Sequence, residues 1–251
     1  MHINTYPRTL LLILIFSLFG PALMAGEARI AVASNFSDAM RELAKSYQAH
    51  TGNTVTLIFG STGKHFAQVV HGAPFDAFFA ADIKRPRLLE QQGYTVPSSR
   101  FTYAIGQIVL WSPKQKLVDN QGQILKSDNF RYLAIANPKL APYGKAGQQV
   151  LQSHQLWRKL QGQLVRGENI GQTYQFVKSG NAELGFVAYS QIIKHSGGSY
   201  WRVPQSLYNP IQQQAVLLKD NPVAADFLLY VKSDAGQQII RDFGYEVADV
   251  K

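Results

Sequence analysis

The hydrophobic positions of this chain change their spacing in a repeated order from residue 26 onward. Short, mostly apolar runs such as 30–33 and 55–59 are each followed by a segment like 36–47, in which apolar residues recur every three or four positions. The first spacing is typical of buried strands and the second of amphipathic helices. Strands that alternate with helices predict a parallel sheet with crossover helices.

Two such series are expected. The first contains three strands and three helices: strands 30–33, 55–59 and 77–80, and helices 36–51, 66–72 and 84–92. The second also contains three of each: strands 132–136, 164–165 and 184–187, and helices 145–153, 156–160 and 170–179. A strand at 213–218 and two helices at 222–231 and 235–243 complete the pattern.

Two longer apolar runs, 101–111 and 213–218, join the two series. We therefore expect an α/β protein of two lobes that are linked by two crossover strands. Lobe 1 is predicted to contain residues 26–106 and 213–251, and lobe 2 residues 107–212. Sheets of this kind bind ligands outside the carboxyl ends of their strands, so a cleft between the lobes is the expected site.

The first 25 residues follow a different pattern. A short polar start with Arg8 precedes the apolar run 9–19, and Gly20-Pro21 ends that run before a possible cleavage site near Ala25. This is the layout of a secretory signal peptide, and the run is shorter than the roughly 18 apolar residues that a membrane span needs. We expect 1–25 to be a cleavable signal peptide; the alternative is an uncleaved N-terminal anchor.

The composition narrows the class of protein further. The 251 residues are 46% hydrophobic and 16% charged, which is typical of a globular protein rather than a disordered one. There is no cysteine, which excludes disulfides, thiolate metal sites, thiol nucleophiles and a lipid-anchored cysteine. The net charge of +9 favours anions, but Lys and Arg are scattered without a basic run, so we expect no nucleic-acid binding.

Candidate chemistry in lobe 1 lies at two junctions between a strand and a helix. Ser34 and Asn35 follow the first strand, and Ser61 and Thr62 follow the second. Each junction combines hydroxyl groups with free backbone N–H groups at the positive end of a helix dipole. A single junction of this kind is ordinary helix capping. Two of them on consecutive strands predict a pocket that holds a small anion with neutral donors.

Lobe 2 offers two more junctions. The segment Ala141-Pro142-Tyr143-Gly144 is expected to be a stiff loop that opens a helix and places the phenol of Tyr143 at the cleft. The alternative, which the sequence alone favours, is that the ring of Tyr143 serves packing only. At Glu168-Asn169-Ile170-Gly171, Asn169 is expected to cap a helix and to leave the N–H group of Ile170 free. The alternative for this second segment is a cap without a ligand.

Catalytic motifs are not found. Gly60-Ser61-Thr62-Gly63-Lys64 is similar to a phosphate-binding loop, but Ile58 replaces its first glycine and His65 its magnesium-binding hydroxyl residue. No Gly-x-Ser-x-Gly elbow and no His pair at i,i+4 occurs. Asp76 and Asp82 are more typical of turns and caps than of an acid–base pair. We expect neither enzymatic activity, nor a cofactor, nor a bare metal ion.

Five motifs occur in order along the chain: Ala33-Ser34-Asn35-Phe36, Phe59-Gly60-Ser61-Thr62-Gly63, Gly72-Ala73-Pro74-Phe75-Asp76 with Ala80-Ala81-Asp82, Ala141-Pro142-Tyr143-Gly144, and Leu184-Gly185-Phe186-Val187-Ala188. With them, the chain resembles the periplasmic molybdate-binding proteins of ABC importers over nearly all of its length after residue 25. The resemblance implies a type II periplasmic-binding fold with two hinged α/β lobes. It places the ligand contacts on six residues: Ser34, Asn35, Ser61, Thr62, Tyr143 and the backbone N–H of Ile170.

The sequence departs from the family pattern at one position. Many members place a binding tyrosine directly after the Leu-Gly-x-Val strand, where this chain has Ala188. A subgroup of the family supplies the phenol from the Ala-Pro-Tyr-Gly segment instead, and Tyr143 matches that subgroup. Tyr189 is one residue further along, so its side chain is expected to point to the other face.

The resemblance implies a receptor that captures molybdate, and with it tungstate, and delivers the anion to a membrane permease. The mature protein is then expected to be a monomer in the periplasm. Both anions are fully deprotonated tetrahedral dianions at neutral pH, so they require hydrogen-bond donors alone. Sulfate or another tetrahedral oxyanion is the first alternative ligand, and an enzyme built on the same fold is a less favoured alternative.

Overall fold

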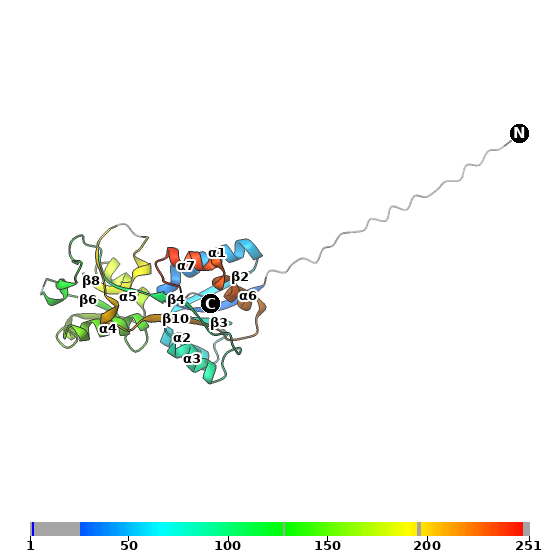
Figure 1. Ribbon diagram of the computed structural model, residues 1–251, viewed down its shortest axis with the longest axis horizontal. Helices are drawn as coiled ribbons and strands as arrows, with labels where there is room; N and C mark the ends of the chain where they lie inside the picture. Colours follow the sequence, from blue (N-terminus) through cyan, green and yellow to red (C-terminus); the bar gives the residue numbers. More distant parts are fainter. Residues whose placement is uncertain (1, 3–25, 128, 195–196, 248–251) are drawn as a thin grey trace.

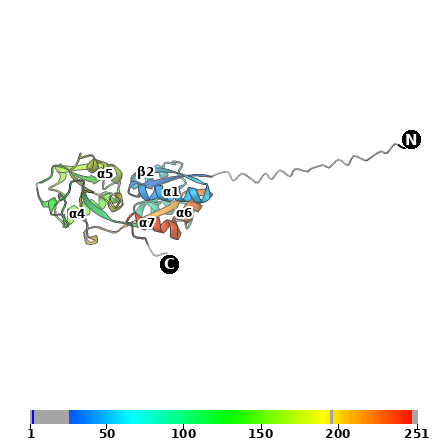
Figure 2. The same ribbon diagram turned by 90° about the horizontal axis from the view of Figure 1, so that it is seen from above.

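The computed structural model describes residues 2, 26–127, 129–194 and 197–247. These residues form two α/β lobes, each built around a five-stranded sheet, and the lobes lie side by side in both views (Figures 1 and 2). The predicted signal peptide lies outside the described residues except for His2. Within the described part of the chain, no helix combines the length and the apolar character that crossing a membrane requires.

The sheet of lobe 1 has the strand order β2-β1-β3-β10-β4. Its strands are β1 (Glu27–Ala33), β2 (Thr54–Gly60), β3 (Ala77–Ala80), β4 (Phe101–Gly106) and β10 (Ile211–Leu217). β1 is parallel to both β2 and β3, and Ala33 is paired with Gly60. The carboxyl ends of β1 and β2 therefore lie next to each other, which brings the two predicted junctions together.

The sheet of lobe 2 has the order β7-β6-β8-β5-β9. Its strands are β5 (Ile108–Ser112), β6 (Leu133–Ala136), β7 (Leu164–Gly167), β8 (Leu184–Ala188) and β9 (Ser199–Arg202). β6 is parallel to β7 and β8, whereas β5 is antiparallel to β8 and β9. The three parallel strands are those of the second βα series, so their carboxyl ends also share one edge.

Seven α-helices pack against the two sheets in the described part of the chain. Lobe 1 carries α1 (Ser37–Thr51), α2 (Thr62–Val70), α3 (Lys84–Gln91), α6 (Pro222–Lys232) and α7 (Asp234–Asp242). Lobe 2 carries α4 (Pro142–Ser153) and α5 (Ile170–Lys178). In Figure 1, α6 and α7 lie with lobe 1 beside α1, so the end of the chain returns to the lobe in which it began.

Two crossovers connect the lobes, and they differ from the predicted ones. The run 101–111 is not one strand: β4 ends at Gly106 in one sheet and β5 starts at Ile108 in the other. The return crossover is the segment 203–210 between β9 and β10, rather than the strand predicted at 213–218. Lobe 1 contains the sheet of β1–β4 and β10, and lobe 2 the sheet of β5–β9. The predicted boundaries between residues 106 and 107 and between 212 and 213 stay a prediction.

Other local predictions also differ from the structure, and α2 begins at Thr62 instead of residue 66. α4 begins at Pro142 instead of residue 145. Proline fits the first turn of a helix, because the N–H group that it lacks would have no partner within the helix there. Segment 156–160 forms turns instead of a helix, and Gln155 before it has a φ of 60°, which an α-helix does not accommodate. β9 was not predicted, because Trp201 is the one buried residue among its four and the segment contains no apolar run.

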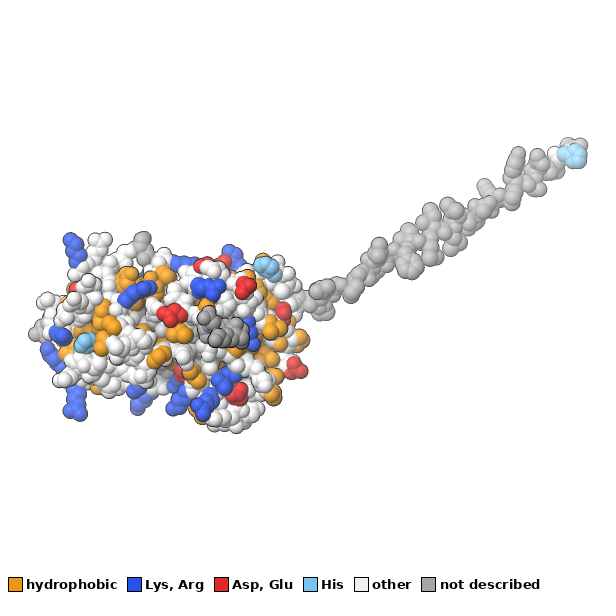
Figure 3. Space-filling view, in the orientation of Figure 1, with side chains coloured by type: hydrophobic (Ala, Val, Ile, Leu, Met, Phe, Trp, Pro, Cys, Tyr) orange, Lys and Arg blue, Asp and Glu red, His pale blue; other side chains and the backbone are white. Residues whose placement is uncertain are grey.

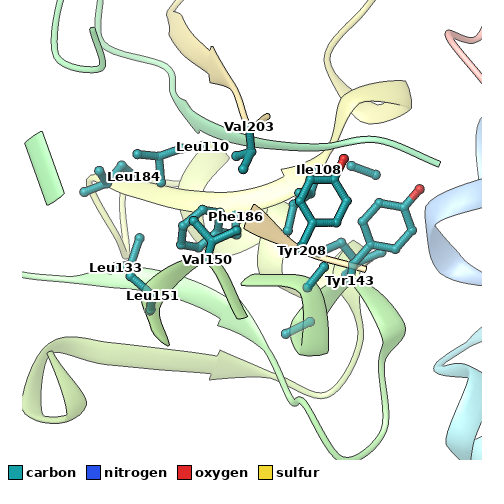
Figure 4. Packing of buried hydrophobic residues seen from close by; sticks show 14 of the residues in the cluster. Ile108, Leu110, Leu133, Tyr143, Val150, Leu151, Leu184, Phe186, Val203 and Tyr208 are labelled. Carbon is teal, nitrogen blue, oxygen red and sulfur yellow. The ribbon is translucent and has the colours of Figure 1, made fainter. Parts of the chain in front are cut away.

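The hydrophobic core is continuous between the lobes at the cleft. The core of lobe 2 consists of the apolar side chains of β5, β6, β8 and α4, and it includes Tyr143 (Figure 4). Ala33 and Ala81 of lobe 1 belong to the same buried cluster. The structure is therefore a closed one, in which the strand ends of lobe 1 pack directly on the first turn of α4.

Candidate anion-binding site

A small cavity lies between the two lobes, where the strand ends of both sheets meet. In this closed structure, the space open to the centre of a water-sized sphere is about 10 Å³. All six predicted ligand residues line it, together with six neighbours: Ala33, Gly60, Ala81, Ala141, Pro142 and Asn169. None of the twelve lining side chains carries a formal charge. A cavity of this size admits only a small guest, and it excludes larger organic molecules.

Ser34 connects the two lobes at the cavity. It follows β1 directly and begins a short 3₁₀ turn that leads into α1. Its Oγ lies 3.1 Å from Asn169 Oδ1, to which it donates, and it accepts from the N–H of Gly171 at 3.1 Å. Both partners belong to the start of α5 in lobe 2, so this hydroxyl bridges the lobes in the closed structure.

Ser61 and Thr62 are held within lobe 1. Ser61 caps α2, and its Oγ accepts from the N–H of Lys64 at 3.3 Å. The Thr62 Oγ1 accepts from the N–H of Ala81 at 3.1 Å. Both side chains are buried. Because a hydroxyl that accepts a hydrogen bond keeps its own proton, both groups can still donate to a guest in the cavity.

Asn35 lines the cavity, but its side chain takes part in a buried polar network behind it. Its Nδ2 donates to Gln213 Oε1 at 2.7 Å and to the Tyr245 hydroxyl at 3.1 Å. Its backbone oxygen accepts from Tyr245 at 2.7 Å and from Ser190 Oγ at 3.0 Å. The side-chain amide of Asn35 is therefore committed to two partners in lobe 1, and its backbone oxygen reaches Ser190 of lobe 2.

Tyr143 contributes a phenol from the first turn of α4, not from a loop as predicted. The residue is buried, and burial raises the pKa of its hydroxyl well above 10, so the group is protonated at neutral pH. Among the described residues the hydroxyl has no hydrogen-bond partner. The nearby Tyr245 raises that pKa further. In Figure 4 the hydroxyl points away from the other labelled core residues.

Ile170 and Asn169 form the start of α5 as predicted. Asn169 caps the helix, since its Oδ1 accepts from the N–H of Gln172 at 2.9 Å. Ile170 is the first residue of the helix and is buried at the cavity. The first N–H groups of a helix have no partner within the helix, so this end is suited to an anion.

Neither Ala188 nor Tyr189, the two positions that raised the question of the tyrosine donor, lines the cavity. Ala188 is fully buried at the end of β8. The ring of Tyr189 lies under the guanidinium of Arg202 at 4.0 Å and near Tyr200, and it does not line the cavity.

The polar network behind the cavity was missed by sequence reasoning. It contains Tyr103, Ser190, Gln213 and Tyr245, whose positions are far apart in the chain and meet only through strand pairing. The available signal was the run of three glutamines at 212–214 at the start of an otherwise apolar strand. Burial raises the pKa values of Tyr103 and Tyr245, so both phenols stay protonated.

Charged groups lie around the cavity rather than in it. Lys64 and Glu168 form an ion pair of 3.0 Å between the lobes, and both side chains are about half exposed. Arg85 is paired with Asp82 and donates to the backbone oxygen of Lys139 at 3.0 Å. A larger groove of about 980 Å³ lies beside the cavity, and five cationic side chains line it: Lys84, Arg85, Lys139, Lys145 and Arg166.

The remaining candidate groups have structural roles. The carboxylate of Asp76 accepts from the N–H of Arg29 at 2.6 Å, and that of Asp82 accepts from the N–H of Arg85 at 2.9 Å. His65 packs beneath Gly60, and burial lowers its pKa, so it is neutral at pH 7. Among the described residues, no group of three His, Asp or Glu side chains is placed to hold a metal ion.

The comparisons with known proteins agree with this fold and site. A model of the bacterial extracellular solute-binding proteins matches residues 28–246, and the chain belongs to this family. It is 48% identical to the molybdate-binding protein ModA of Azotobacter vinelandii over 89% of this chain and 91% of that protein. It is 45% identical to ModA of Rhodobacter capsulatus, over 96% and 98%.

A solved structure supports the same relationship. The periplasmic molybdate-binding protein of Azotobacter vinelandii superimposes with a TM-score of 0.86 at 43% identity, over 88% of this chain and all of that one. The predicted two-lobe fold and the predicted resemblance are therefore confirmed.

Proposed function

We propose that this protein captures molybdate and presents it to the membrane permease of an ABC importer. The observation that carries this proposal is a closed cavity between two lobes that is lined only by neutral residues, with hydroxyls at Ser34, Ser61, Thr62 and Tyr143. Relatives at 48% and 45% identity are named molybdate-binding proteins. The proposed roles of the six predicted site residues rest on this placement.

The donor set agrees with the chemistry of the proposed ligand. All oxygens of molybdate are acceptors at neutral pH, so hydroxyls, N–H groups and helix N-termini satisfy it without a buried counter-charge. A buried ion pair would carry a desolvation cost that this arrangement avoids. A singly protonated phosphate needs an acceptor for its proton, and no carboxylate lines the cavity.

Tungstate has the same charge and shape as molybdate, so the proposal includes it as a second ligand. The periplasm is the proposed location, and the signal-peptide pattern at 1–25 supports it. A monomer is the proposed form, and no cofactor is part of the proposal.

Titration of the purified protein tests the proposal. Calorimetry with molybdate, tungstate, sulfate and phosphate should give micromolar or tighter binding for the first two, on the order of −8 kcal/mol or better. Sulfate should bind at least tenfold more weakly, because it is smaller and the donors of both lobes cannot all reach it. Equal affinity for sulfate and molybdate would assign the protein to oxyanions in general.

A further inference from the structure

Gln213 occupies a fully buried position on β10, directly behind the cavity. The pairing of β10 with β4 skips Tyr103 between Gln213 and Gln214, so the extra residue of this bulge lies on β4. The Gln213 side chain enters the polar network between the lobes, where its Oε1 accepts from Asn35 and Tyr103. Gln214 instead bonds Arg100 and Thr102, which lie outside the cavity lining.

The orientation of the Gln213 amide is fixed by its neighbours. The Tyr245 hydroxyl donates to the backbone oxygen of Asn35 at 2.7 Å, so it presents its lone pair to the Asn35 side chain 3.1 Å away. Asn35 must then face it with its NH₂ group, which also donates to Gln213 Oε1 at 2.7 Å. The amide oxygen of Gln213 is thus directed to Asn35, and its Nε2 points the other way.

Two buried polar atoms from opposite lobes are left without partners at this point. Gln213 Nε2 and the Tyr143 hydroxyl are the buried side-chain atoms that lack a hydrogen bond within the described residues. Both atoms lie close to the backbone of Gly106. A Cβ atom built on Gly106 would lie 2.0 Å from the Tyr143 hydroxyl oxygen and 2.9 Å from Gln213 Nε2. Buried groups without partners are rare in folded proteins, and each one calls for an explanation.

We propose that Gln213 is a positioning residue for Tyr143 when an anion is bound. Its Nε2 donates to the phenol oxygen, so the single phenol proton is directed at the anion. A phenol alone can either donate a hydrogen bond to the guest or accept one from it. When Gln213 donates to the phenol oxygen, the phenol is left to act as the donor to the guest. The phenol oxygen of Tyr143 then accepts no hydrogen bond from the guest, which favours fully deprotonated anions over protonated ones. This inference rests on the proposed function.

A double-mutant cycle tests this role. Gln213→Met keeps the length of the side chain and removes its hydrogen bonds, and Tyr143→Phe removes the phenol hydroxyl. With molybdate in calorimetry, we expect Gln213→Met to weaken binding roughly 2- to 13-fold, the size of one neutral hydrogen bond. In the Tyr143→Phe background the same change should have almost no effect. An equal loss in both backgrounds would overturn the proposal, since Gln213 would then act without Tyr143.

Controls separate positioning from folding. Gln214→Met changes the neighbouring glutamine on the same strand and should leave the molybdate affinity unchanged. Circular dichroism of the ligand-free variants verifies their fold, and Gln213→Asn, which withdraws the amide by one methylene, replaces Gln213→Met in the cycle if that variant does not fold.

The preference for deprotonated anions gives a second readout that packing alone would not move. Gln213→Glu places an acceptor behind the phenol, so we expect the ratio of molybdate to phosphate affinity to fall. An unchanged ratio would contradict the proposed selectivity. If the wild-type protein binds sulfate but not molybdate, the proposed function fails, and the same cycle performed with sulfate still tests Gln213.

Discussion

The two lobes contribute to the cavity in different ways. In lobe 1, Ser61 and Thr62 already hold hydrogen bonds within their own lobe, to the N–H groups of Lys64 and Ala81. In lobe 2, the Tyr143 hydroxyl has no such partner in the described part of the chain. The hydroxyls of lobe 1 thus serve the fold as well as the site, whereas the phenol of lobe 2 is left for the guest.

This difference indicates which substitutions should affect stability and which should affect binding. Removal of a hydroxyl from lobe 1 leaves a backbone N–H group without its acceptor. Removal of the phenol hydroxyl leaves no unpaired group behind, because loss of an unsatisfied buried group is nearly neutral for stability or even favourable. The predictions below test that contrast, from the largest expected effect to the smallest.

Tyr143→Phe should have the largest effect on affinity. A hydrogen bond to a charged group contributes about 1.5–3 kcal/mol, so molybdate should bind roughly 10- to 150-fold more weakly. The unfolding free energy of the ligand-free protein should be unchanged or slightly raised. Calorimetry and denaturant unfolding measure the two quantities. Tyr189→Phe is the matched control and should do little; a silent Tyr143→Phe beside a damaging Tyr189→Phe would reverse the assignment of the donor.

Saturation with molybdate should raise the stability of the whole protein, because the guest binds groups of both lobes. At about 100 times the dissociation constant, a ligand that binds only the folded state adds roughly 2.7 kcal/mol. A thermal melt with and without molybdate measures this increase. At the same molybdate concentration the shift should be smaller for Tyr143→Phe, and the absence of any shift in the wild type would argue against a site shared by two lobes.

Ser61→Ala should lower the stability of the ligand-free protein, in contrast to Tyr143→Phe. The loss of a helix N-cap costs about 1 kcal/mol, with a range of 0.5–2 kcal/mol. Urea unfolding without ligand measures this effect at a fixed pH. If Ser61→Ala leaves stability intact while Tyr143→Phe lowers it, the contrast drawn between the lobes is wrong.

The ion pair between Lys64 and Glu168 should make the smallest difference. Both side chains are about half exposed, and exposed pairs contribute about 0.2–1 kcal/mol. Lys64→Met should therefore weaken molybdate binding by no more than roughly fivefold, and the effect should shrink at high salt. Titration at two ionic strengths checks this. A larger loss would mean that the ion pair outside the cavity, rather than the contacts at the cavity, holds the two lobes together.

The lobe 1 site was predictable because its signal is local. Ser34, Ser61 and Thr62 follow strands directly, and parallel strands share one edge, so their approach followed from the alternation of strands and helices. The start of α5 at Ile170 followed from the Asn169 cap in the same way. The two-lobe fold also followed from this alternation.

The polar network behind the cavity could not be predicted, because it depends on strand order and on a bulge. Gln213 reaches Asn35 only because β10 inserts between β3 and β4, and nothing in the local pattern indicates that insertion. The division of residues 101–111 between two sheets could not be predicted either. The hydrophobic pattern continues on both sides of Gln107, where one strand ends and the next begins.

The polar network affects the order in which the parts of the protein can fold during synthesis. Asn35 and Tyr245 are 210 positions apart in the chain, although their oxygens lie 2.7 Å from each other. Glu246 is tied to Ile105 by backbone hydrogen bonds of 2.7 and 3.1 Å. Contacts between such distant positions form late, because a long loop must close before they contribute.

A chain that grows from its amino end therefore completes this region last. β10 is the strand that lies between β3 and β4, and it is made after every one of the six predicted site residues. A fragment that stops before residue 211 contains Ser34, Tyr143 and Ile170 in its sequence but lacks the strand that joins β3 to β4 in the sheet of lobe 1. All six predicted site residues are thus synthesised before the fold that holds them can be completed.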